Sequence, residues 1–226
     1  MTIGRTGLAA LLALFAIGVT TTVSLLAAGP NPPHGTNYML LYGMKDGLDP
    51  ANPNNYVIGV TTTASVIGAV VRNFADTPKV QDFTNQLSLK YYFVNRTCSG
   101  GTRVQLTISP SGKNNDPKAG NAFGYLGDVA FGGNCAANTW VYEDMTDAAP
   151  KWDLSQFHGL TPAPSCNMTC TWAQVVTYFS NFPGHKVLQF AVADDSCSFA
   201  VAACGTAYYD HVQAGDDSLE SRPDDH

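Results

Sequence analysis

Two central stretches of the chain alternate between apolar and polar residues. In residues 87–94 the odd positions hold Leu, Leu, Tyr and Phe, and the even positions begin with Ser, Lys and Tyr. Residues 102–108 repeat the alternation, with Val104, Leu106 and Ile108 on one side. A period of two places successive side chains on opposite faces of a half-buried strand. Because Gly100 and Gly101 lie between the stretches, we expect the two strands to pair as a hairpin.

More strands are predicted on both sides of this pair. Residues 56–72 are rich in β-branched side chains interleaved with Gly and Thr, which favours two strands with a break near Ser65 or Gly68. A further short strand is expected within residues 122–130. Residues 186–193 and 206–213 predict two strands joined by the loop that carries Cys197 and Cys204.

One segment changes to a helical period. Thr171 and Gln174 match a capping box, and Pro183 and Gly184 predict that the helix ends at Asn181. The apolar residues recur at i, i+3, i+4 and i+7: Trp172, Val175, Val176 and Phe179. The pattern as a whole predicts an all-β chain with one short helix, folded as an antiparallel, jelly-roll-like β-sandwich whose open end or face the helix covers.

The chain begins with an apolar stretch, Leu8 to Ala28, that follows Arg5. Residues 1–28 are interpreted as a signal peptide or as a retained N-terminal membrane anchor, because no good small-residue cleavage site follows the stretch. Residues 29–36 then form a Pro-rich linker. We expect a single β-sandwich domain over residues 37–214 and an acidic, disordered tail over residues 215–226.

The six cysteines predict disulfide bonds and therefore an oxidising compartment, so that the protein is expected to be secreted or on the cell surface. Six cysteines allow many pairings, and spacing alone does not prove one. Proximity along the chain favours Cys98 with Cys135, Cys166 with Cys170, and Cys197 with Cys204. A zinc site at the Cys166–Cys170 pair is the weaker alternative, since no second pair of ligands has a suitable spacing.

Composition changes the picture in two ways. Only 13% of the residues are charged, which suits a secreted all-β protein, and the net charge is −6. A polyanionic duplex would be repelled, so we expect no nucleic-acid partner.

Candidate catalytic residues are few. The chain has only two glutamates, and the single acidic cluster beside aromatic residues is formed by Glu143 and Asp144. Glycoside hydrolysis needs two carboxylates that flank the scissile bond. A polysaccharide hydrolase or lyase that uses Glu143 and Asp144 is therefore retained only as an alternative, and we predict no catalytic residues.

Aromatic residues are concentrated between Phe123 and Phe157, where the strand pattern is weak. Four of them are candidates for stacking on a sugar: Trp140, Tyr142, Trp152 and Tyr125. The alternative is that the tryptophans are core residues, because aromatic rings are mostly buried for their area.

Oxygen-bearing side chains also offer ligands for a structural Ca²⁺. The candidates are Asp46 and Asp49 near the start of the domain and Asp210 near its end. Turn-forming Asp and Asn residues explain the same pattern without a metal.

The stretch Gly205-Thr-Ala-Tyr-Tyr-Asp210-His-Val-Gln-Ala-Gly215 resembles the closing strand of secreted jelly-roll domains of the laminin-G-like and carbohydrate-binding-module group, which often end in a Gly-Thr-aromatic-x-Asp-x-Val pattern. The resemblance implies that Asp210 helps to hold a structural calcium near the N-terminal strand. The paired acids of the enzymatic members are absent from this chain.

These observations lead to one main hypothesis and two alternatives. The main hypothesis is a non-catalytic extracellular or cell-surface module that recognises glycan or cell-envelope material. The first alternative is a self-assembling subunit of an extracellular filament or surface layer, with its apolar N-terminus retained or exchanged between protomers. The second is the polysaccharide enzyme described above.

Overall fold

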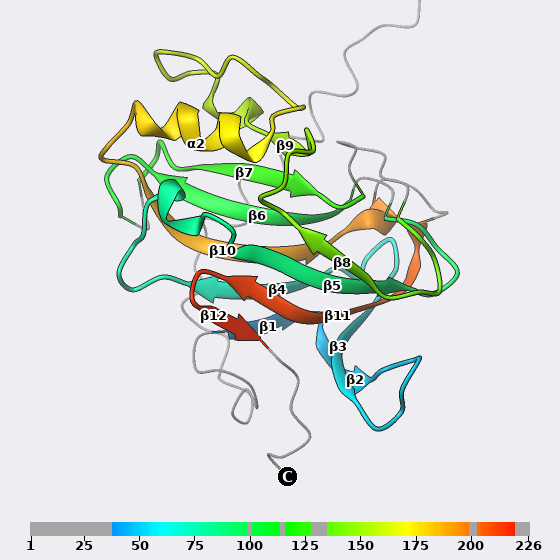
Figure 1. The fold of residues 1–226 in the computed structure, drawn as a ribbon. Helices are drawn as coiled ribbons and strands as arrows, with labels where there is room; N and C mark the ends of the chain where they lie inside the picture. The colour runs from blue at the N-terminus through cyan, green and yellow to red at the C-terminus, as the bar shows by residue number, and fades with distance from the viewer. Residues whose placement is uncertain (1–37, 99–100, 114–115, 128–134, 199–202, 220–226) are drawn as a thin grey trace, which may run out of the picture. The chain divides into compact units, whose positions relative to one another are not determined.

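The computed structural model describes residues 38–98, 101–113, 116–127, 135–198 and 203–219, all of which belong to one compact unit (Figure 1). The expected signal peptide or anchor, the Pro-rich linker and the last seven residues of the expected tail lie outside the described residues. Within the described residues, the structure has no helix that is long and apolar enough to cross a membrane.

Two antiparallel sheets form the fold. Sheet A has six strands in the order β1 (Tyr38–Tyr42), β4 (Gly68–Asn73), β10 (Lys186–Asp194), β6 (Thr102–Ser109), β7 (Gly120–Tyr125) and β9 (Trp152–Asp153). Sheet B has the order β2 (Lys45–Leu48), β3 (Tyr56–Thr62), β11 (Gly205–Ala214), β5 (Leu87–Phe93) and β8 (Val141–Asp144), and β12 (Asp217–Leu219) pairs with β11. The prediction of an all-β, antiparallel β-sandwich is confirmed.

The predicted hairpin of β5 and β6 is wrong, although both strands exist. Strand β5 pairs with β11 and β8 in sheet B, whereas β6 pairs with β10 and β7 in sheet A. The same change of sheet separates β3 from β4 and β10 from β11. The apolar face of an alternating strand packs against the opposite sheet, whichever strands pair with its backbone edges. Alternation therefore identifies the strands but not their partners.

Buried polar contacts tie two of these crossovers together. Arg96, between β5 and β6, forms an ion pair with Asp194 at the end of β10, and both side chains are buried. The hydroxyl of Tyr209 on β11 donates to Oδ2 of Asp194 over 2.8 Å. Next to this cluster, Arg103 makes two hydrogen bonds to the carboxylate of Asp195, of 2.6 and 3.0 Å. Because each buried charge has a partner, the cluster fixes where the chain passes from one sheet to the other.

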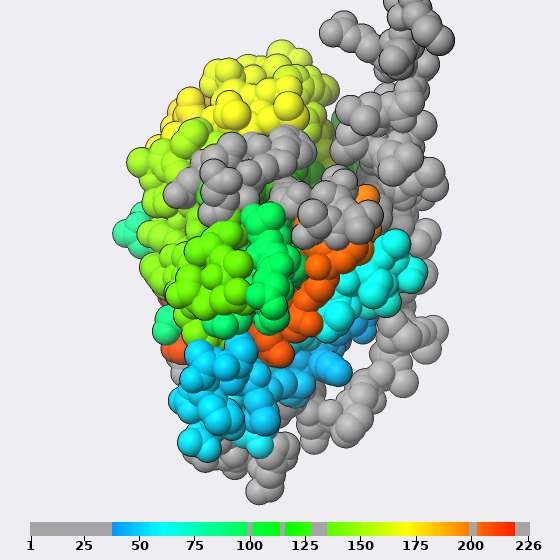
Figure 2. Space-filling model, turned by 90° about the vertical axis from the view of Figure 1, so that its right-hand side faces the viewer, coloured from blue at the N-terminus to red at the C-terminus, as the bar shows by residue number. Residues whose placement is uncertain are grey.

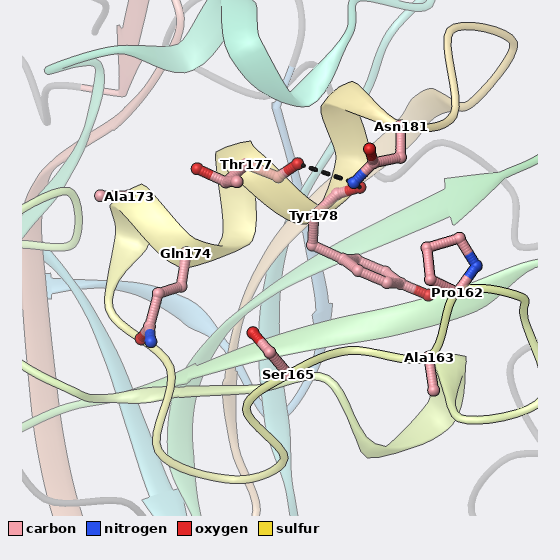
Figure 3. A pocket seen from close by; sticks show the side chains of 8 residues that line it. All are labelled: Pro162, Ala163, Ser165, Ala173, Gln174, Thr177, Tyr178 and Asn181. Atoms are coloured by element: carbon pink, nitrogen blue, oxygen red, sulfur yellow. Dashed lines mark hydrogen bonds between the residues drawn. The ribbon is translucent and has the colours of Figure 1, made fainter.

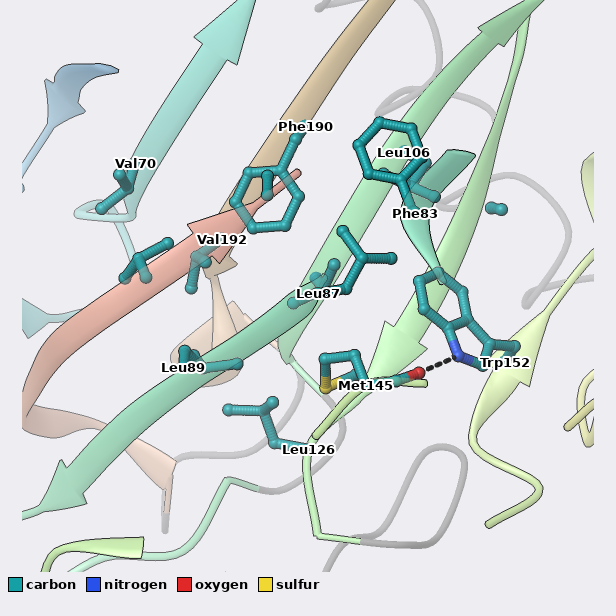
Figure 4. Packing of buried hydrophobic residues seen from close by; sticks show 14 of the residues in the cluster. Val70, Phe83, Leu87, Leu89, Leu106, Leu126, Met145, Trp152, Phe190 and Val192 are labelled. Carbon is teal, nitrogen blue, oxygen red and sulfur yellow. Dashed lines mark hydrogen bonds between the residues drawn. The ribbon is translucent and has the colours of Figure 1, made fainter. Parts of the chain in front are cut away.

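The core lies between the sheets and is built from the inward-facing residues of both (Figure 4). Leu87 and Leu89 of β5 face Val192 and Phe190 of β10 across this layer. A second, small apolar cluster consists of Ala69, Val71 and Ala191, which belong to sheet A and lie outside the main core.

The predicted helix is confirmed as α2 (Trp172–Ser180), with its C-cap at Asn181. The hydroxyl of Thr171 accepts from the backbone N–H of Gln174, and Oε1 of Gln174 accepts from the backbone N–H of Thr171 over 2.8 Å. Its buried residues, Trp172, Val175, Tyr178 and Phe179, join the main core. Three short 3-10 helices complete the described elements: η1 (Val80–Phe83), η2 (Ser155–Phe157) and η3 (Ser196–Ser198).

The domain continues past the boundary expected at residue 214. Strand β12 pairs with β11 through Leu219 opposite Val212, and Leu219 is buried in the core. Tyr38 and Arg72 both contact Asp217: the Tyr38 hydroxyl donates to its backbone carbonyl over 3.0 Å, and Arg72 lies 3.7 Å from its carboxylate. The first part of the expected acidic tail is therefore a strand, which the acidic composition concealed.

All six cysteines are disulfide-bonded, in the pairs that proximity favoured. The bonds join Cys98 to Cys135, Cys166 to Cys170, and Cys197 to Cys204. The prediction of a disulfide-stapled sandwich is confirmed, and the zinc alternative is excluded because both sulfurs of the Cys166–Cys170 pair are bonded to each other.

Candidate functional site

The outer face of sheet B carries a set of aromatic side chains that the core does not use. In the paired segments of β5 and β11, Tyr91 and Tyr209 are buried, while Tyr92 and Tyr208 lie on the opposite face and remain partly exposed. In Figure 2 the green atoms of the segment around β5 lie between lime atoms on one side and the orange atoms of β11 on the other, with the cyan atoms of β3 next to them. The order on the surface thus follows the order of strands in sheet B.

Three aromatic rings form a row across the strands, which we call the aromatic row: Trp140, Tyr92 and Tyr208. Tyr92 lies opposite Tyr208 in the strand register, and their ring centroids are 6.4 Å apart. Trp140 immediately precedes β8, and its ring centroid is 5.6 Å from that of Tyr92. The ring planes of these two pairs are inclined by 69° and 59°, respectively. The row is therefore continuous but not flat.

A glycine of the neighbouring strand determines how the ring of Tyr208 lies. Tyr208 is opposite Gly59 of β3, and a Cβ atom at Gly59 would stand 3.1 Å from both Cδ1 and Cε1 of the tyrosine. A Cβ at Gly47 of β2 would lie 3.6 Å from Cε1, which is an ordinary contact. The missing side chain at Gly59 lets the phenol ring rest against the backbone of the neighbouring strand. Gly59 thus provides a contact surface for the ring at one end of the aromatic row.

A hydrogen bond joins the other end of the row to the loop that follows β2. The indole Nε1 of Trp140 donates to Oδ1 of Asp49 over 2.9 Å. The same carboxylate accepts from the backbone N–H of Ala51 and from the side-chain amide of Asn55, so it also organises the β2–β3 loop. Burial acts to raise the pKa of Asp49, but the hydrogen bonds from Trp140, Ala51 and Asn55 outweigh it and hold this pKa below its ordinary value.

Beside the aromatic row runs a second row of polar groups, which we call the polar row: Tyr142, Lys90 and Asp210. Tyr142 of β8 lies opposite Lys90 of β5, and Lys90 lies opposite Asp210 of β11. Tyr142 is 62% exposed, whereas Asp210 is 7% exposed. Because residues two apart on a strand lie about 6.8 Å from one another, the two rows run in parallel at that spacing.

Two of the four predicted ligand-binding aromatics are core residues instead. Trp152 is fully buried, donates from Nε1 to the carbonyl of Met145 over 2.8 Å, and packs on Trp172 with 4.9 Å between centroids (Figure 4). Tyr125 is 5% exposed. Neither ring can stack on a ligand, so the prediction is corrected for both, and only Trp140 and Tyr142 remain at the candidate site.

The three aspartates proposed as calcium ligands do not come together as a site. Among the residues that the structure describes, no group of three or more His, Cys, Asp or Glu side chains is placed to hold a metal ion. Asp49 is occupied by the hydrogen bonds to the loop and to Trp140, Asp46 lies exposed on β2, and Asp210 contacts His211. The turn-forming role of Asp49 accounts for its place in the sequence.

Glu143 and Asp144, the residues of the enzymatic alternative, have structural partners. Glu143 is 7% exposed and forms an ion pair with Lys151, which is fully buried. Asp144 accepts from both the backbone N–H and the hydroxyl of Thr146, over 2.8 and 2.7 Å. Both acids therefore have structural partners: Glu143 neutralises a buried ammonium, and Asp144 holds the turn that follows it.

A hollow of about 360 Å³ lies between α2 and the segment before Cys166 (Figure 3). It is lined by Pro162, Ala163 and Ser165 on one side and by residues of α2, including Thr177, on the other. None of its eight lining residues is charged, and the hydroxyl of Tyr178 donates to the carbonyl of Phe157 over 3.3 Å. It has no charged group, whereas the outer face of sheet B carries Lys90 and Asp210.

Sequence reasoning missed Tyr92, Tyr208, Lys90 and His211. The signal was present in the alternation of residues 87–94, which places Tyr92 and Lys90 on the face opposite the core. Outward aromatic residues that lie side by side form a patch that can mark a binding surface. Tyr208 could be placed beside Tyr92 only once the partner of β5 was known.

Comparison with known proteins identifies no family. No family model and no curated protein matches the chain. Among solved structures, the chain is similar to the family 11 carbohydrate-binding module of the cellulosomal cellulase Lic26A-Cel5E of Clostridium thermocellum, with 10% identity and a TM-score of 0.39 over 82% of this chain and 88% of that one. That module belongs to one of the two groups that the closing strand resembles.

Proposed function

We propose that this protein is a non-catalytic extracellular module that binds a glycan chain on the outer face of sheet B. The observation that carries the proposal is the continuous aromatic row of Trp140, Tyr92 and Tyr208 beside a parallel polar row. A pyranose has an apolar face of C–H groups and a rim of hydroxyls, so it is matched by aromatic faces next to hydrogen-bonding groups.

The tilt of the rings favours a single soluble chain over a crystalline surface. Neighbouring rings are inclined by 59° and 69°, so no flat ligand can lie on all three at once. A single chain can twist from one ring to the next and present its hydroxyls to Lys90 and Asp210. Soluble oligosaccharides are therefore the appropriate probes.

The extracellular location is supported by the three disulfide bonds, which persist in oxidising compartments. The alternative of a filament or surface-layer subunit stays a prediction, and electron microscopy of the purified protein checks it directly.

Titration calorimetry with soluble hexasaccharides tests the proposal. The probes are β-1,4-linked glucose, β-1,3-linked glucose, β-1,4-linked mannose, β-1,4-linked xylose and β-1,4-linked N-acetylglucosamine. We expect binding of at least one probe and a loss of about tenfold or more in affinity for Tyr92→Ala and for Tyr208→Ala, since tenfold corresponds to about 1.4 kcal/mol of lost stacking. Absence of binding to every probe by the folded wild-type protein would overturn the proposal.

The matched control is Tyr42→Asn. Tyr42 is 65% exposed but lies on β1 of sheet A, so its removal should not change the affinity. Asn is chosen because the backbone at position 42 is left-handed, with φ of 62°, and Asn tolerates that conformation.

A further inference from the structure

Strand β11 contains a bulge at the point where it passes the polar row. Asp210 lies opposite Lys90, but the next pair in the register joins Gln213 to Ser88. Three residue steps on β11 therefore match two on β5, so β11 carries one extra residue. Bulges of this kind change the direction of a side chain and are common next to functional sites.

The extra residue brings His211 into a left-handed conformation, with φ of 48°. Residues other than glycine are uncommon in this conformation, although Asn, Asp and His adopt it more often than other residues do, so the surrounding structure holds His211 there at some cost to folding. The side chain of His211 is 48% exposed, so the core does not require a histidine at this position for packing. A strained, exposed histidine in the middle of a strand needs an explanation other than stability.

The histidine is oriented by the carboxylate that precedes it. Nδ1 of His211 lies 2.9 Å from Oδ2 of Asp210, and the backbone N–H of His211 donates to Oδ1 of Asp210, also over 2.9 Å. In the neutral imidazole, the Nδ1–H group donates to the carboxylate, and Nε2 is left as a hydrogen-bond acceptor. The Asp210–His211 pair thus presents an oriented acceptor beside the ammonium donor of Lys90.

We propose that the Asp210–His211 pair recognises, through hydrogen bonds, the hydroxyl groups of the glycan that stacks on the aromatic row. This inference rests on the proposed function and adds the ligand chemistry to it. Asp210 is two residues from Tyr208, so the pair stands about 6.8 Å along the strand from the aromatic row, at the rim of a stacked sugar. Nε2 of His211 accepts from one hydroxyl and Lys90 donates to its neighbour. The preferred ligand is a neutral chain whose hydroxyls along that edge are free rather than acetylated or methylated.

The variant His211→Gly separates this role from folding. Glycine accepts the left-handed backbone without strain, so the thermal midpoint of the variant should be unchanged or higher than that of the wild type. Its affinity for the best of the five hexasaccharides should fall about tenfold. The matched control is Asn85→Gly, at another left-handed residue (φ of 56°) outside the two rows, which should leave affinity unchanged.

The outcomes distinguish this inference from the proposed function. If His211→Gly binds as tightly as the wild type while Tyr92→Ala does not, the inference fails and the function stands. If the wild type binds none of the probes, the function itself fails. A lowered thermal midpoint for His211→Gly would show that the histidine is needed for folding and would also overturn the inference. A methylated form of the best-bound hexasaccharide gives a second readout. The inference requires that methylation weaken binding to the wild type, and that it weaken binding to His211→Gly by a smaller factor.

Discussion

The carboxylate of Asp49 and the indole of Trp140 join two segments from opposite edges of sheet B. Asp49 follows β2, which is the first strand of the sheet in the order given above, and Trp140 precedes β8, which is the last. Their hydrogen bond of 2.9 Å fixes the position of the indole at one end of the aromatic row. A loop aspartate is therefore part of the candidate site although it need not touch a ligand.

Asp49→Ala is expected to lower the free energy of unfolding by about 2 kcal/mol, because hydrogen bonds to a charged group are lost from both the indole and the loop. It should also weaken glycan binding by releasing Trp140. Asp49→Asn keeps an acceptor for the indole, so it should lose less unfolding free energy and less glycan affinity than Asp49→Ala does. Urea unfolding monitored by tryptophan fluorescence measures the first effect, and equal losses for the two variants would contradict the role of the hydrogen bond.

The same carboxylate predicts a pH dependence. Hydrogen bonds hold the pKa of Asp49 in the folded protein below its ordinary value of 3.8, despite the opposing effect of burial. A depressed folded pKa gives stabilisation that is complete above the unfolded pKa and is lost as the pH falls through the folded pKa. The difference in unfolding free energy between the wild type and Asp49→Asn should therefore be constant above about pH 5 and shrink at lower pH. A difference that stays constant down to pH 2 would show that the charge of Asp49 is not what matters.

The geometry of the site explains why the sequence predicted only some of its residues. Trp140 and Tyr142 stood out because they lie in a segment with many aromatic residues, but so did Trp152 and Tyr125, which are core residues. Local sequence does not tell an exposed ring from a buried one when the strand pattern is weak. The row itself depends on β5 lying beside β11, a pairing between segments more than a hundred residues apart, which no local pattern encodes.

The contact between the ring of Tyr208 and Gly59 gives a prediction for which Gly47→Ala is a matched control. Gly59→Ala places a methyl group 3.1 Å from two atoms of the phenol ring, so the ring must move away from the sheet. We expect a loss of about fivefold in affinity for the best-bound hexasaccharide, with little change in stability, because the ring is partly exposed and can move. Gly47→Ala adds the same methyl group at 3.6 Å, an ordinary contact, and should bind as the wild type does. Equal affinities for the two variants would mean that the position of Tyr208 does not matter.

The fold was more predictable than the pairing of its strands. Alternation located β5 and β6 to within one residue, and the capping box located α2, because these signals depend on neighbours in sequence. The change of sheet between β5 and β6 depends on Arg96, whose buried partner Asp194 lies almost a hundred residues later in the chain. The sequence between the strands contains glycines that suit a hairpin as well as a crossover.

Glu143 and Lys151 give a test that separates a structural from a catalytic role. Glu143→Gln removes the carboxylate of Glu143 from the buried ammonium of Lys151, which also pairs with Asp147, at 3.0 Å and 40% exposed. Breaking a buried pair in this way should cost about 3 kcal/mol of stability. The double variant Glu143→Leu with Lys151→Met removes both charges and should recover most of the loss, whereas Asp147→Asn should cost less than about 1 kcal/mol. Chemical denaturation of the variants provides the measurement. A fully stable Glu143→Gln protein would refute the structural role.

The three disulfide bonds should contribute unequally to stability, in the order of the loops that they close. In the chain-entropy model, a sequence separation of 37 between Cys98 and Cys135 corresponds to about 4 kcal/mol. Separations of 7 for Cys197–Cys204 and 4 for Cys166–Cys170 correspond to about 2.5 and about 2 kcal/mol. Paired Cys→Ala variants, one pair at a time, test this order by guanidinium unfolding. The Cys98–Cys135 bond also anchors the crossover from β5 to β6, so its removal should produce the largest loss. If removal of the Cys166–Cys170 pair cost the most, loop closure would not be the main contribution of these bonds.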